Sequence, residues 1–202
     1  RKIHRWLSVI IGMQLLMWTI SGLVFSWSPI GEVRGENRIR PRKAIDLASY
    51  ELIDSREILS SAKYVPDNHL VKGLALKQML GKPVFELRLD GPSTSHVLVD
   101  AVSGRCLSPI SKSLAEDIAL DDFSEPVQVL RCDYLDQPQT GHSEYRSKEI
   151  PVWKVTLDHP SGTAIYVSAN RGEVVTRRND RWRLFDRSEE HTSELQSRQY
   201  LV

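Results

Sequence analysis

Apolar positions are densest near the start of the chain, where Trp6 to Trp27 form one stretch without a charged residue. As a helix this stretch reaches roughly 31 Å, which matches the ~30 Å hydrocarbon core of a bilayer. Tryptophan is typical of membrane interfaces, so Trp6, Trp18 and Trp27 are the expected membrane anchors. The pattern predicts a transmembrane helix over residues 1–28 with a basic flank at its start.

Two other interpretations of this stretch fit less well. A cleaved signal peptide has an apolar region of about 7–15 residues and a small-residue cleavage site, and residues 24–28 offer no such site. A buried core helix usually carries one polar stripe, which Ser8, Gln14 and Thr19 do not form. An uncleaved signal anchor stays open as a close variant. Charge fixes the orientation poorly, because three Lys and Arg stand before the stretch and five soon after it, which is the opposite of what an exported body needs. Residues upstream of this sequence can change this count.

An internal repeat follows. Residues 82–107 align with residues 150–175 without a gap, which indicates a duplicated supersecondary unit. The residues that mark the repeat are Pro83, Asp100 and Gly104 in the first copy and Pro151 and Gly172 in the second.

Both copies alternate apolar and polar side chains with a period of two, which favours strands over helix. In the first copy, Phe85, Leu87 and Leu89 are predicted on one face and Glu86 and Arg88 on the other. The turn-rich segments 90–95 and 158–163 are expected to close hairpins. The other expected strands are the returns at 96–102 and 164–169 and two earlier strands at 70–79 and 127–134.

A short helix is expected before each set of strands, because Asp54 to Glu57 and Ser113 to Glu116 both read as capping boxes. Each unit is then one helix followed by three or four antiparallel strands. The predicted fold class is α+β, with an N-terminal transmembrane helix and two tandem units. The second unit carries a longer polar loop at 135–148, which we expect to be a docking surface.

The chain ends in a segment of a different kind. Residues 187–197 read RSEEHTSELQS, which matches the translation of a sequencing-adapter oligonucleotide, so residues 187–202 are interpreted as an artefact. We expect the natural protein to extend beyond both ends. The predicted segments are a transmembrane helix (1–28), a juxtamembrane linker (29–43), two units (44–108 and 109–178) and an approach to a second span (179–186).

Composition and motifs exclude several classes of function. The net charge is +1, whereas a nucleic-acid interface needs a basic face, so no nucleic-acid partner is expected. No nucleophile elbow, zinc-protease motif or phosphate loop is present, so no catalytic residues are predicted and an enzyme is not favoured. The acids between Glu116 and Glu125 are predicted to form a solvated helix face rather than a cation site. His69, His96, His142 and His159 lie far apart, so no metal site is expected.

Two cysteines, Cys106 and Cys132, leave two alternatives open. They form a disulfide if the body lies outside the cytoplasm and the geometry permits it, or they are two unrelated buried thiols.

The chain resembles the PepSY-associated transmembrane family of bacterial membrane proteins. The resemblance rests on the opening of the span at 1–7, on Val99-Asp100-Ala101 with Ser103-Gly104, and on the run 181–186. The second copy departs from this pattern, because it has Ser168 and Arg171 where Asp100 and Ser103 stand in the first.

The resemblance implies a protein of the bacterial cytoplasmic (inner) membrane whose body is periplasmic. It also implies a second transmembrane helix as a partner of the first. Some relatives serve iron uptake as membrane reductases of ferric siderophores and bind haem through histidines of their spans. Only His4 matches such an axial ligand, and its alternative role is that of an interfacial residue beside lipid phosphates.

Three functions follow from the sequence patterns taken together with this resemblance. The favoured hypothesis is a binding or regulatory module that captures a periplasmic protein partner, with a link to iron uptake. The second is a fragment of a haem-containing ferric-siderophore reductase, in which His4 holds haem. The third is a protease-restraining module, since free PepSY domains resemble protease propeptides.

Overall fold

The computed structural model describes residues 2–27, 29–60, 64–65, 69–90, 95–138, 143–145 and 149–187. It is an α+β structure with one long apolar helix and two antiparallel sheets, of three and four strands. The helices are α1 (Lys2–Trp27), α2 (Ile30–Val33), α3 (Ser55–Ser60) and α4 (Lys112–Asp122), with 3-10 turns η1 (Glu36–Arg38) and η2 (Leu47–Ser49); residues 180–187 are also helical. The strands are β1 (Val71–Met79), β2 (Lys82–Leu89), β3 (Ser95–Asp100), β4 (Val129–Leu135), β5 (Val152–Leu157), β6 (Ala164–Ser168) and β7 (Val174–Arg178).

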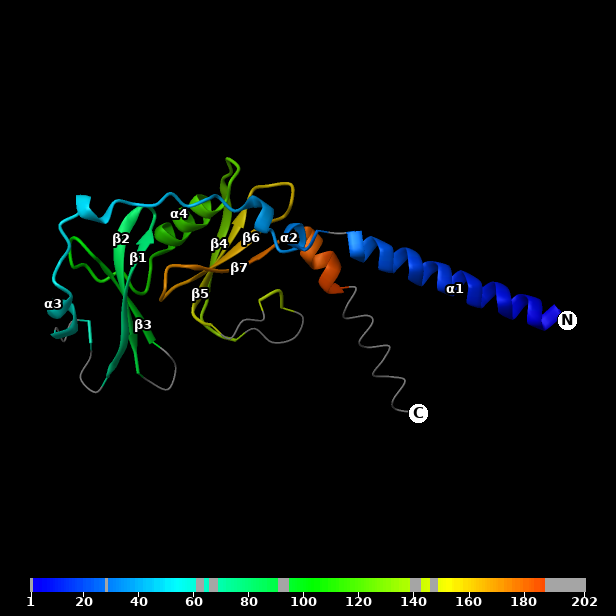
Figure 1. The fold of residues 1–202 in the computed structure, drawn as a ribbon, viewed down its shortest axis with the longest axis horizontal. Coiled ribbons are helices and arrows are strands. Elements are labelled where there is room, and N and C mark those ends of the chain that lie inside the picture. Colours follow the sequence, from blue (N-terminus) through cyan, green and yellow to red (C-terminus); the bar gives the residue numbers. More distant parts are fainter. Residues whose placement is uncertain are drawn as a thin grey trace.

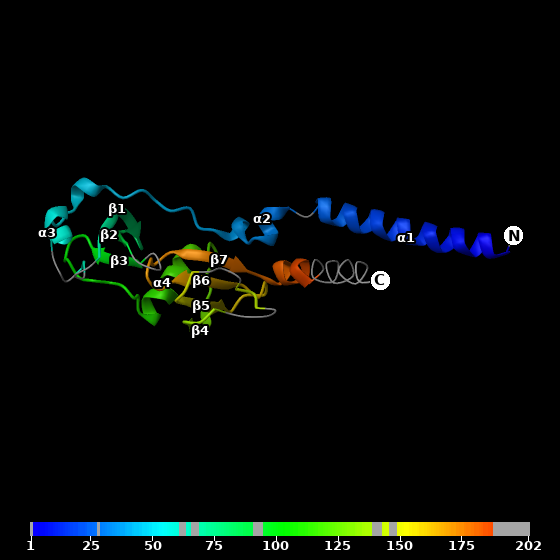
Figure 2. The same ribbon diagram turned by 90° about the horizontal axis from the view of Figure 1, so that it is seen from below.

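Helix α1 leaves the body as a rod, as both ribbon views show (Figures 1 and 2). Its segment Lys2–Leu23 is long and apolar enough to cross a membrane, and none of that apolar window is buried. Ser8 and Thr19 donate their hydroxyls to the carbonyl oxygens of His4 and Leu15, at 2.9 and 2.8 Å. These two polar groups are therefore satisfied inside the helix, which lowers the cost of placing them in lipid.

The two sheets share the same pairing register over the aligned residues. The first sheet has the order β1-β2-β3, and Phe85 pairs with Val99 in it. The second has the order β4-β5-β6-β7, and the matching residues Trp153 and Val167 pair in the same way. The first strand of each sheet carries an irregularity at the same place, after Val71 in β1 and after Val129 in β4.

The helix caps also correspond, although one differs from its prediction. Asp54 accepts a hydrogen bond from the Arg56 backbone N–H before α3, as expected. Before α4 the cap is Ser111, whose hydroxyl accepts from the Leu114 backbone N–H, and not Ser113. Ser113 is instead inside the helix, where its hydroxyl lies 3.0 Å from that of Ser111.

Each sheet is covered on one face by the helix that precedes it. Ile58 of α3 and Tyr64 pack on Phe85, Leu87 and Leu89 of the first sheet. Likewise α4 packs on Val155, Leu157 and Val167 of the second. The second sheet is also covered on its outer face, where Tyr145 stacks on Tyr166 with ring centroids 4.8 Å apart.

This covering changes the interpretation of the 135–148 loop. Its residue Tyr145 is 2% exposed, and the neighbouring Glu144 binds Arg183 at 2.6 Å. Residues 143–145 of the loop therefore pack on the second unit, whereas residues 136–138 are exposed, and the loop as a docking surface stays a prediction. Residues 139–142 and 146–148 lie outside the described part.

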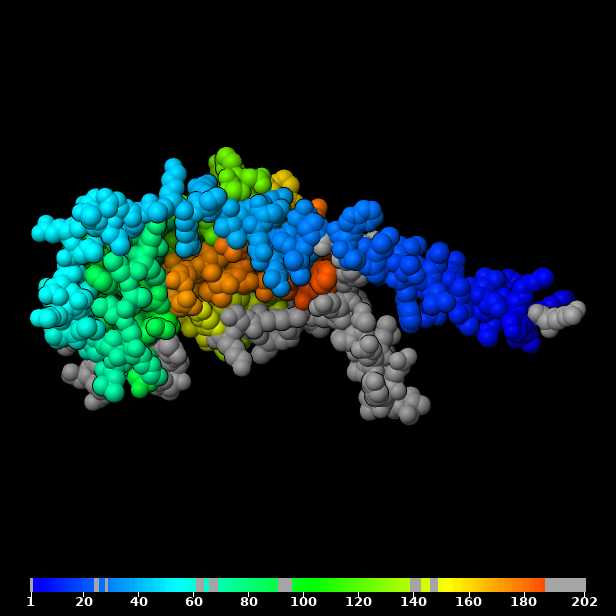
Figure 3. Space-filling model, viewed as in Figure 1, coloured from blue at the N-terminus to red at the C-terminus, as the bar shows by residue number. Residues whose placement is uncertain are grey.

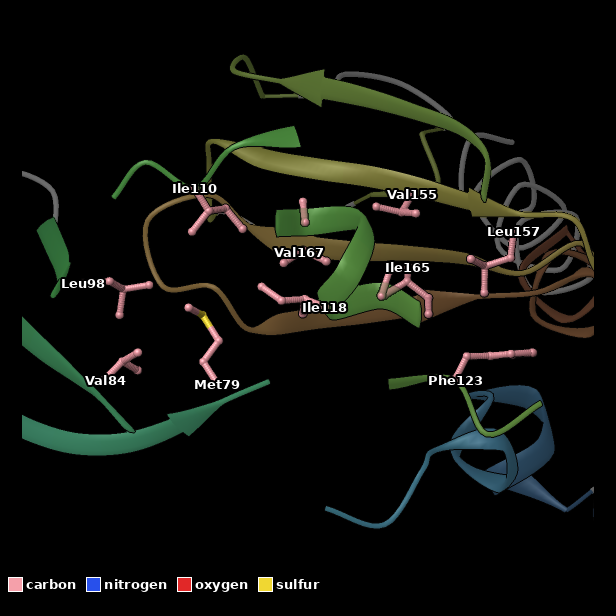
Figure 4. Close-up of a cluster of buried hydrophobic side chains, with 12 residues drawn as sticks. Met79, Val84, Leu98, Ile110, Ile118, Phe123, Val155, Leu157, Ile165 and Val167 are labelled. Atoms are coloured by element: carbon pink, nitrogen blue, oxygen red, sulfur yellow. The ribbon is translucent and has the colours of Figure 1, made fainter. Parts of the chain in front are cut away.

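The two units share one hydrophobic core. Met79, Val84 and Leu98 of the first sheet face Ile110 and the second unit (Figure 4). The turn between β6 and β7 enters this contact at Gly172, which has a φ of +59°. A Cβ added to Gly172 would lie 2.7 Å from Met79 Sδ and 3.0 Å from Leu98 Cδ1. We call this contact region the junction.

Residues 29–46, which we call the strap and which include the expected juxtamembrane linker (29–43), pack along the body. Near its start, Asn179 Nδ2 donates to the Glu32 carbonyl oxygen at 3.0 Å and Arg181 pairs with the Glu32 carboxylate. Further on, Ile39 forms a bridge with Phe123, and the Arg40 backbone N–H donates to the Asp122 carbonyl oxygen at 2.8 Å. The strap runs beside β7 and reaches the first unit at its far end (Figure 3).

Because of the strap, the order of the units in space is reversed relative to the sequence. The second unit lies next to α1 and α2, and the first unit lies at the end of the molecule farthest from α1 (Figures 1 and 2). The junction is therefore also distant from α1.

Candidate functional site

The junction holds a cluster of charged side chains inside the body. The first sheet contributes Lys77 from β1, Glu86 from β2 and His96 from β3. Glu86 lies on the same face as Val84, because alternate residues of a strand share a face. It pairs directly with Ala75 and Leu98 across the sheet, which places Lys77 and His96 at its diagonals.

Glu86 is the centre of this cluster and is only 8% exposed. Its carboxylate lies 2.7 Å from Lys77 Nζ and 2.7 Å from His96 Nδ1. Glu86 lies on the face opposite to Phe85 and Leu87, as the alternation predicts, and this face is also buried at Glu86 because the second unit covers it.

The second unit supplies the rest of the cluster from the β6–β7 turn. Lys77 Nζ donates to the Arg171 carbonyl oxygen and to Glu173, both at 2.7 Å. Arg171 in turn binds Glu173 at 2.5 Å, Glu149 at 3.4 Å and Glu86 at 3.6 Å. We call these six residues, Lys77, Glu86, His96, Glu149, Arg171 and Glu173, the ionic cluster.

The departures of the second copy from the repeat explain how this cluster arises. In the first copy the Asp100 carboxylate accepts from the Ser103 backbone N–H at 2.7 Å and caps the turn. In the second copy Ser168 Oγ accepts from the Arg171 backbone N–H at 3.1 Å and caps the equivalent turn. The turn geometry is kept, and the side chain of Arg171 is placed against the first unit.

The charges of the cluster control the protonation of Glu86. Burial acts to raise the pKa of its carboxyl, but the hydrogen bond and charge of Lys77 and the nearby His96 and Arg171 outweigh it. The net effect lowers the Glu86 pKa below its ordinary value of 4.5. The carboxylate is thus ionised at neutral pH, and the cluster acts as an electrostatic contact between the units.

A cleft of about 640 Å³ opens beside the cluster, between the strap and the two units. This volume is in the usual range of ligand sites. Its floor is apolar, with Met79, Leu80 and Ile118, and cationic strap side chains form its rim. We call it the junction cleft; its lining residues are Arg40, Pro41, Arg42, Lys43, Gln78, Met79, Leu80, Gly81, Ile118, Asp121, Gly172 and Glu173.

The acids of the junction cleft are already compensated. Asp121 lies 3.9 Å from Arg40, and Glu173 binds Lys77 and Arg171 of the ionic cluster. Within the described ranges, Arg42 and Lys43 form no ion pair. The cleft therefore presents two uncompensated positive charges above an apolar floor.

A second polar arrangement lies near α2, in a pocket of about 420 Å³ that His159 and Ser161 line. His159 connects Glu125 and Ser161 in a relay. Its Nε2 lies 3.0 Å from Glu125 Oε2, and its Nδ1 lies 2.7 Å from Ser161 Oγ. However, His159 Nδ1 also accepts the Ser161 backbone N–H at 3.2 Å. Its lone pair thus stabilises the turn and is not available as a general base, so the relay does not support nucleophilic catalysis.

The structure separates the candidate residues that the sequence singles out. The pairing of Cys106 with Cys132 is not formed, and both are free thiols. Cys106 forms an isolated backbone β-bridge with Val99 at the edge of the first sheet, whereas Cys132 lies in β4 of the second sheet.

The acids near α4 do not all face solvent. Asp122 is 5% exposed and binds the guanidinium of Arg177 in β7, contrary to the prediction of a solvated face. Among the described residues no group of three His, Cys, Asp or Glu forms a potential metal site. His142 lies outside those residues.

His4 lies on exposed α1, where its Nδ1 is 3.4 Å from Ser8 Oγ. The other described histidines, His69, His96 and His159, lie in the two units and not on α1. These residues alone do not fit a haem site, so His4 as an axial ligand stays a prediction.

The ionic cluster is the feature that sequence reasoning missed. A signal was present, because four of its members stand where the two copies differ in charge. These differences are Glu86 against Lys154, His96 against Ala164, Ser103 against Arg171 and Arg105 against Glu173. A contact between copies of a repeat needs such asymmetry, since identical faces would place like charges together.

Comparisons with known proteins add no identification. No protein-family model, curated protein or solved structure matches the chain. The resemblance to the PepSY-associated family therefore remains an expectation from the motifs.

Proposed function

We propose that the chain is a membrane-anchored binding module of the PepSY type, with its body on the periplasmic side and the junction cleft as its recognition site. The observation that carries this proposal is the cleft itself, an opening lined by four segments from both units and the strap. A cleft at the contact of two units is a common place for ligand recognition.

The electrostatics of the body support binding rather than catalysis. The ionic cluster pairs acids with bases, and the histidine of the Glu125–His159–Ser161 relay is occupied by a turn hydrogen bond. Meanwhile the cleft keeps an apolar floor and unpaired cations. Such a surface recognises a partner by shape and charge.

Membrane anchoring is tested with the whole chain. Expressed in a bacterium, the protein is expected to pellet with vesicles and to resist extraction by sodium carbonate, because α1 buries its apolar surface in lipid. A matched variant with Leu16→Arg and Ile20→Arg places two charges in α1 and should be extracted. Complete extraction of the unmodified chain would overturn the anchoring.

Recognition is tested by site-specific photo-crosslinking in cells. A benzophenone side chain at Gln78 in the junction cleft is expected to form a discrete adduct with one protein. The matched control places the same group at Leu130, which is 68% exposed on β4 and outside the cleft. Equal adducts from both positions, or none from Gln78, would contradict the proposal.

A further inference from the structure

We propose that the junction cleft binds an extended peptide through a carboxylate, with the strap serving as the strand to which the peptide pairs. This inference rests on the proposed binding function and specifies the chemistry of the partner. Three independent properties of the cleft carry it: unpaired backbone, unpaired cations and an apolar floor.

The strap offers backbone groups to a peptide. Where the strap enters the cleft, Ile39 and Arg40 are bound to Phe123 and Asp122, so this part of the strap is fixed on the body. In residues 42–45, which are all described, no backbone N–H or carbonyl oxygen has a hydrogen-bond partner. Exposed backbone of this kind can be completed by an added strand.

The charge of the cleft selects an anionic group. Arg42 and Lys43 are exposed and without ion pairs in the described ranges, while Asp121 and Glu173 are balanced by Arg40 and by the ionic cluster. A carboxylate placed beside the two cations gains charge-assisted hydrogen bonds. The basic side chains of the ionic cluster do not compete for this carboxylate, because they already pair with the acidic side chains of the cluster.

The floor and the position of the cleft point to a peptide rather than a lipid. Met79 and Ile118 are buried, and with Leu80 they form an apolar surface that fits a hydrophobic side chain. Strand β1, which supplies Gln78 and Met79 to the cleft, lies far from α1 in both ribbon views (Figures 1 and 2), so a bilayer that holds α1 does not deliver its lipids there.

The test measures binding of a labelled peptide to the full chain in lipid nanodiscs. The probe is a dye-labelled hexapeptide of alternating threonine and valine that ends in leucine with a free carboxylate. Fluorescence anisotropy is expected to show saturable binding. The same peptide with a terminal amide is expected to bind at least tenfold more weakly, since it lacks the anion.

Two further probes separate the parts of the proposal. An amidated peptide with a glutamate before its leucine shows whether a side-chain carboxylate replaces the terminal one; restored binding assigns the site to acidic side chains, and no restoration assigns it to chain ends. N-methylation of the two valine amides removes donors and should weaken binding about tenfold if the peptide pairs with the strap. Equal binding of the acid and amide peptides overturns the proposal.

Variants of the protein supply the matched control. Arg42→Gln with Lys43→Gln is expected to weaken binding of the acid peptide about tenfold, and to leave the amide peptide unaffected. Lys72→Gln with Arg131→Gln removes the same charge at exposed sites outside the cleft and should change neither. Circular dichroism should be the same for all variants, because none of these side chains is buried.

The result also separates this proposal from the function on which it rests. If Gln78 captures a protein but no carboxylate peptide binds, the cleft recognises its partner in another way and only this proposal fails. If neither experiment gives binding, both fail.

Discussion

Two glycines at the same position of the repeat show how one residue type acquires different neighbours. Gly104 and Gly172 both adopt positive φ, at +65° and +59°. A Cβ on Gly104 would meet the Tyr64 hydroxyl at 3.2 Å, within its own unit. A Cβ on Gly172 would instead meet Met79 of the other unit, so the second turn is part of the junction.

Replacing Gly172 with alanine is therefore expected to loosen the junction. Gly172→Ala adds backbone strain and a clash with Met79 and should lower the free energy of unfolding by about 2–4 kcal/mol. Gly81→Ala is the matched control, because Gly81 has a φ of +74° but open space at the Cβ position; it should cost only about 1 kcal/mol. Urea denaturation in detergent measures both, and equal losses would show that the turn does not pack against Met79.

Glu86 makes the stability of the body depend on pH. Its pKa is lowered in the folded state, so the unfolded chain takes up the proton first as the solution is acidified. The contribution of Glu86 is present above pH 4.5 and is lost as the pH falls below that value. The free energy of unfolding should therefore decrease below about pH 5, as the junction loses its ion pairs to Lys77, His96 and Arg171.

The variant Glu86→Gln isolates this contribution. It should cost about 1–3 kcal/mol at pH 7, because Lys77 and Arg171 lose the negative charge with which they pair, and it should flatten the decline at acid pH. Glu36→Gln serves as the control, since Glu36 is exposed and 3.9 Å from its partner Arg34. A Glu86→Gln protein with the same pH profile as the unmodified chain would refute this role.

At the scale of elements, the repeat forms the same structure twice from different side chains. Asp54 caps α3 and Ser111 caps α4, and each helix covers the sheet that follows it. The irregularities in β1 and β4 also coincide. Different side chains thus produce the same backbone fold in both units, whereas the surfaces of the two units differ.

The cap of α4 gives a prediction that distinguishes the structure from the sequence pattern. Ser111→Ala should lower the free energy of unfolding by about 1 kcal/mol, because the Leu114 backbone N–H loses its acceptor. Ser113→Ala should have little effect, although the capping-box pattern assigns the cap to Ser113. Urea denaturation followed by circular dichroism compares them, and a larger loss from Ser113→Ala would favour the sequence pattern.

Local patterns predicted much of these elements. Period-two alternation located the strands, because Phe85, Leu87 and Leu89 must share a buried face. The same alternation assigns Glu86 to the opposite face, but a strand pattern identifies two faces without showing that the second unit covers this one. The α4 cap was placed two residues late because Ser111 and Ser113 both have cap chemistry, and tertiary packing decides between them.

The candidate site could not be predicted from the sequence, for a related reason. The junction cleft combines the strap with residues more than a hundred positions away in sequence, such as Gly172 and Glu173. The strap shows no apolar periodicity, and it is held mainly by backbone hydrogen bonds and by the side chains of Asn179 and Arg181. Such contacts leave no pattern in the sequence of the strap itself.

At the scale of the whole molecule, labelling of the two cysteines shows whether they are free thiols and on which side of the membrane the body lies. Cys106 is exposed, whereas burial and the charges of Glu116 and Asp133 raise the pKa of Cys132 to about 11. Since the thiolate is the reactive form, a maleimide should label Cys106 at least tenfold faster than Cys132 at pH 7.5.

The measurement uses a membrane-impermeant maleimide on spheroplasts, with Cys106→Ser and Cys132→Ser as the single-thiol controls. If the body is periplasmic as proposed, Cys106 should be labelled without lysis. Labelling only after lysis would place the body in the cytoplasm. A need for reductant before any labelling would instead show that the two cysteines pair.

The reversed order of the units has a consequence for biosynthesis. The first unit leaves the ribosome before the second, yet Met79, Val84 and Leu98 are covered by residues that emerge only with the β6–β7 turn. The strap emerges earlier still, and its anchors at Asp122, Phe123 and Asn179 come much later. A nascent chain of this protein therefore carries an uncovered apolar sheet face from the completion of β3 until the β6–β7 turn has emerged, and exposed apolar surface of this kind favours aggregation.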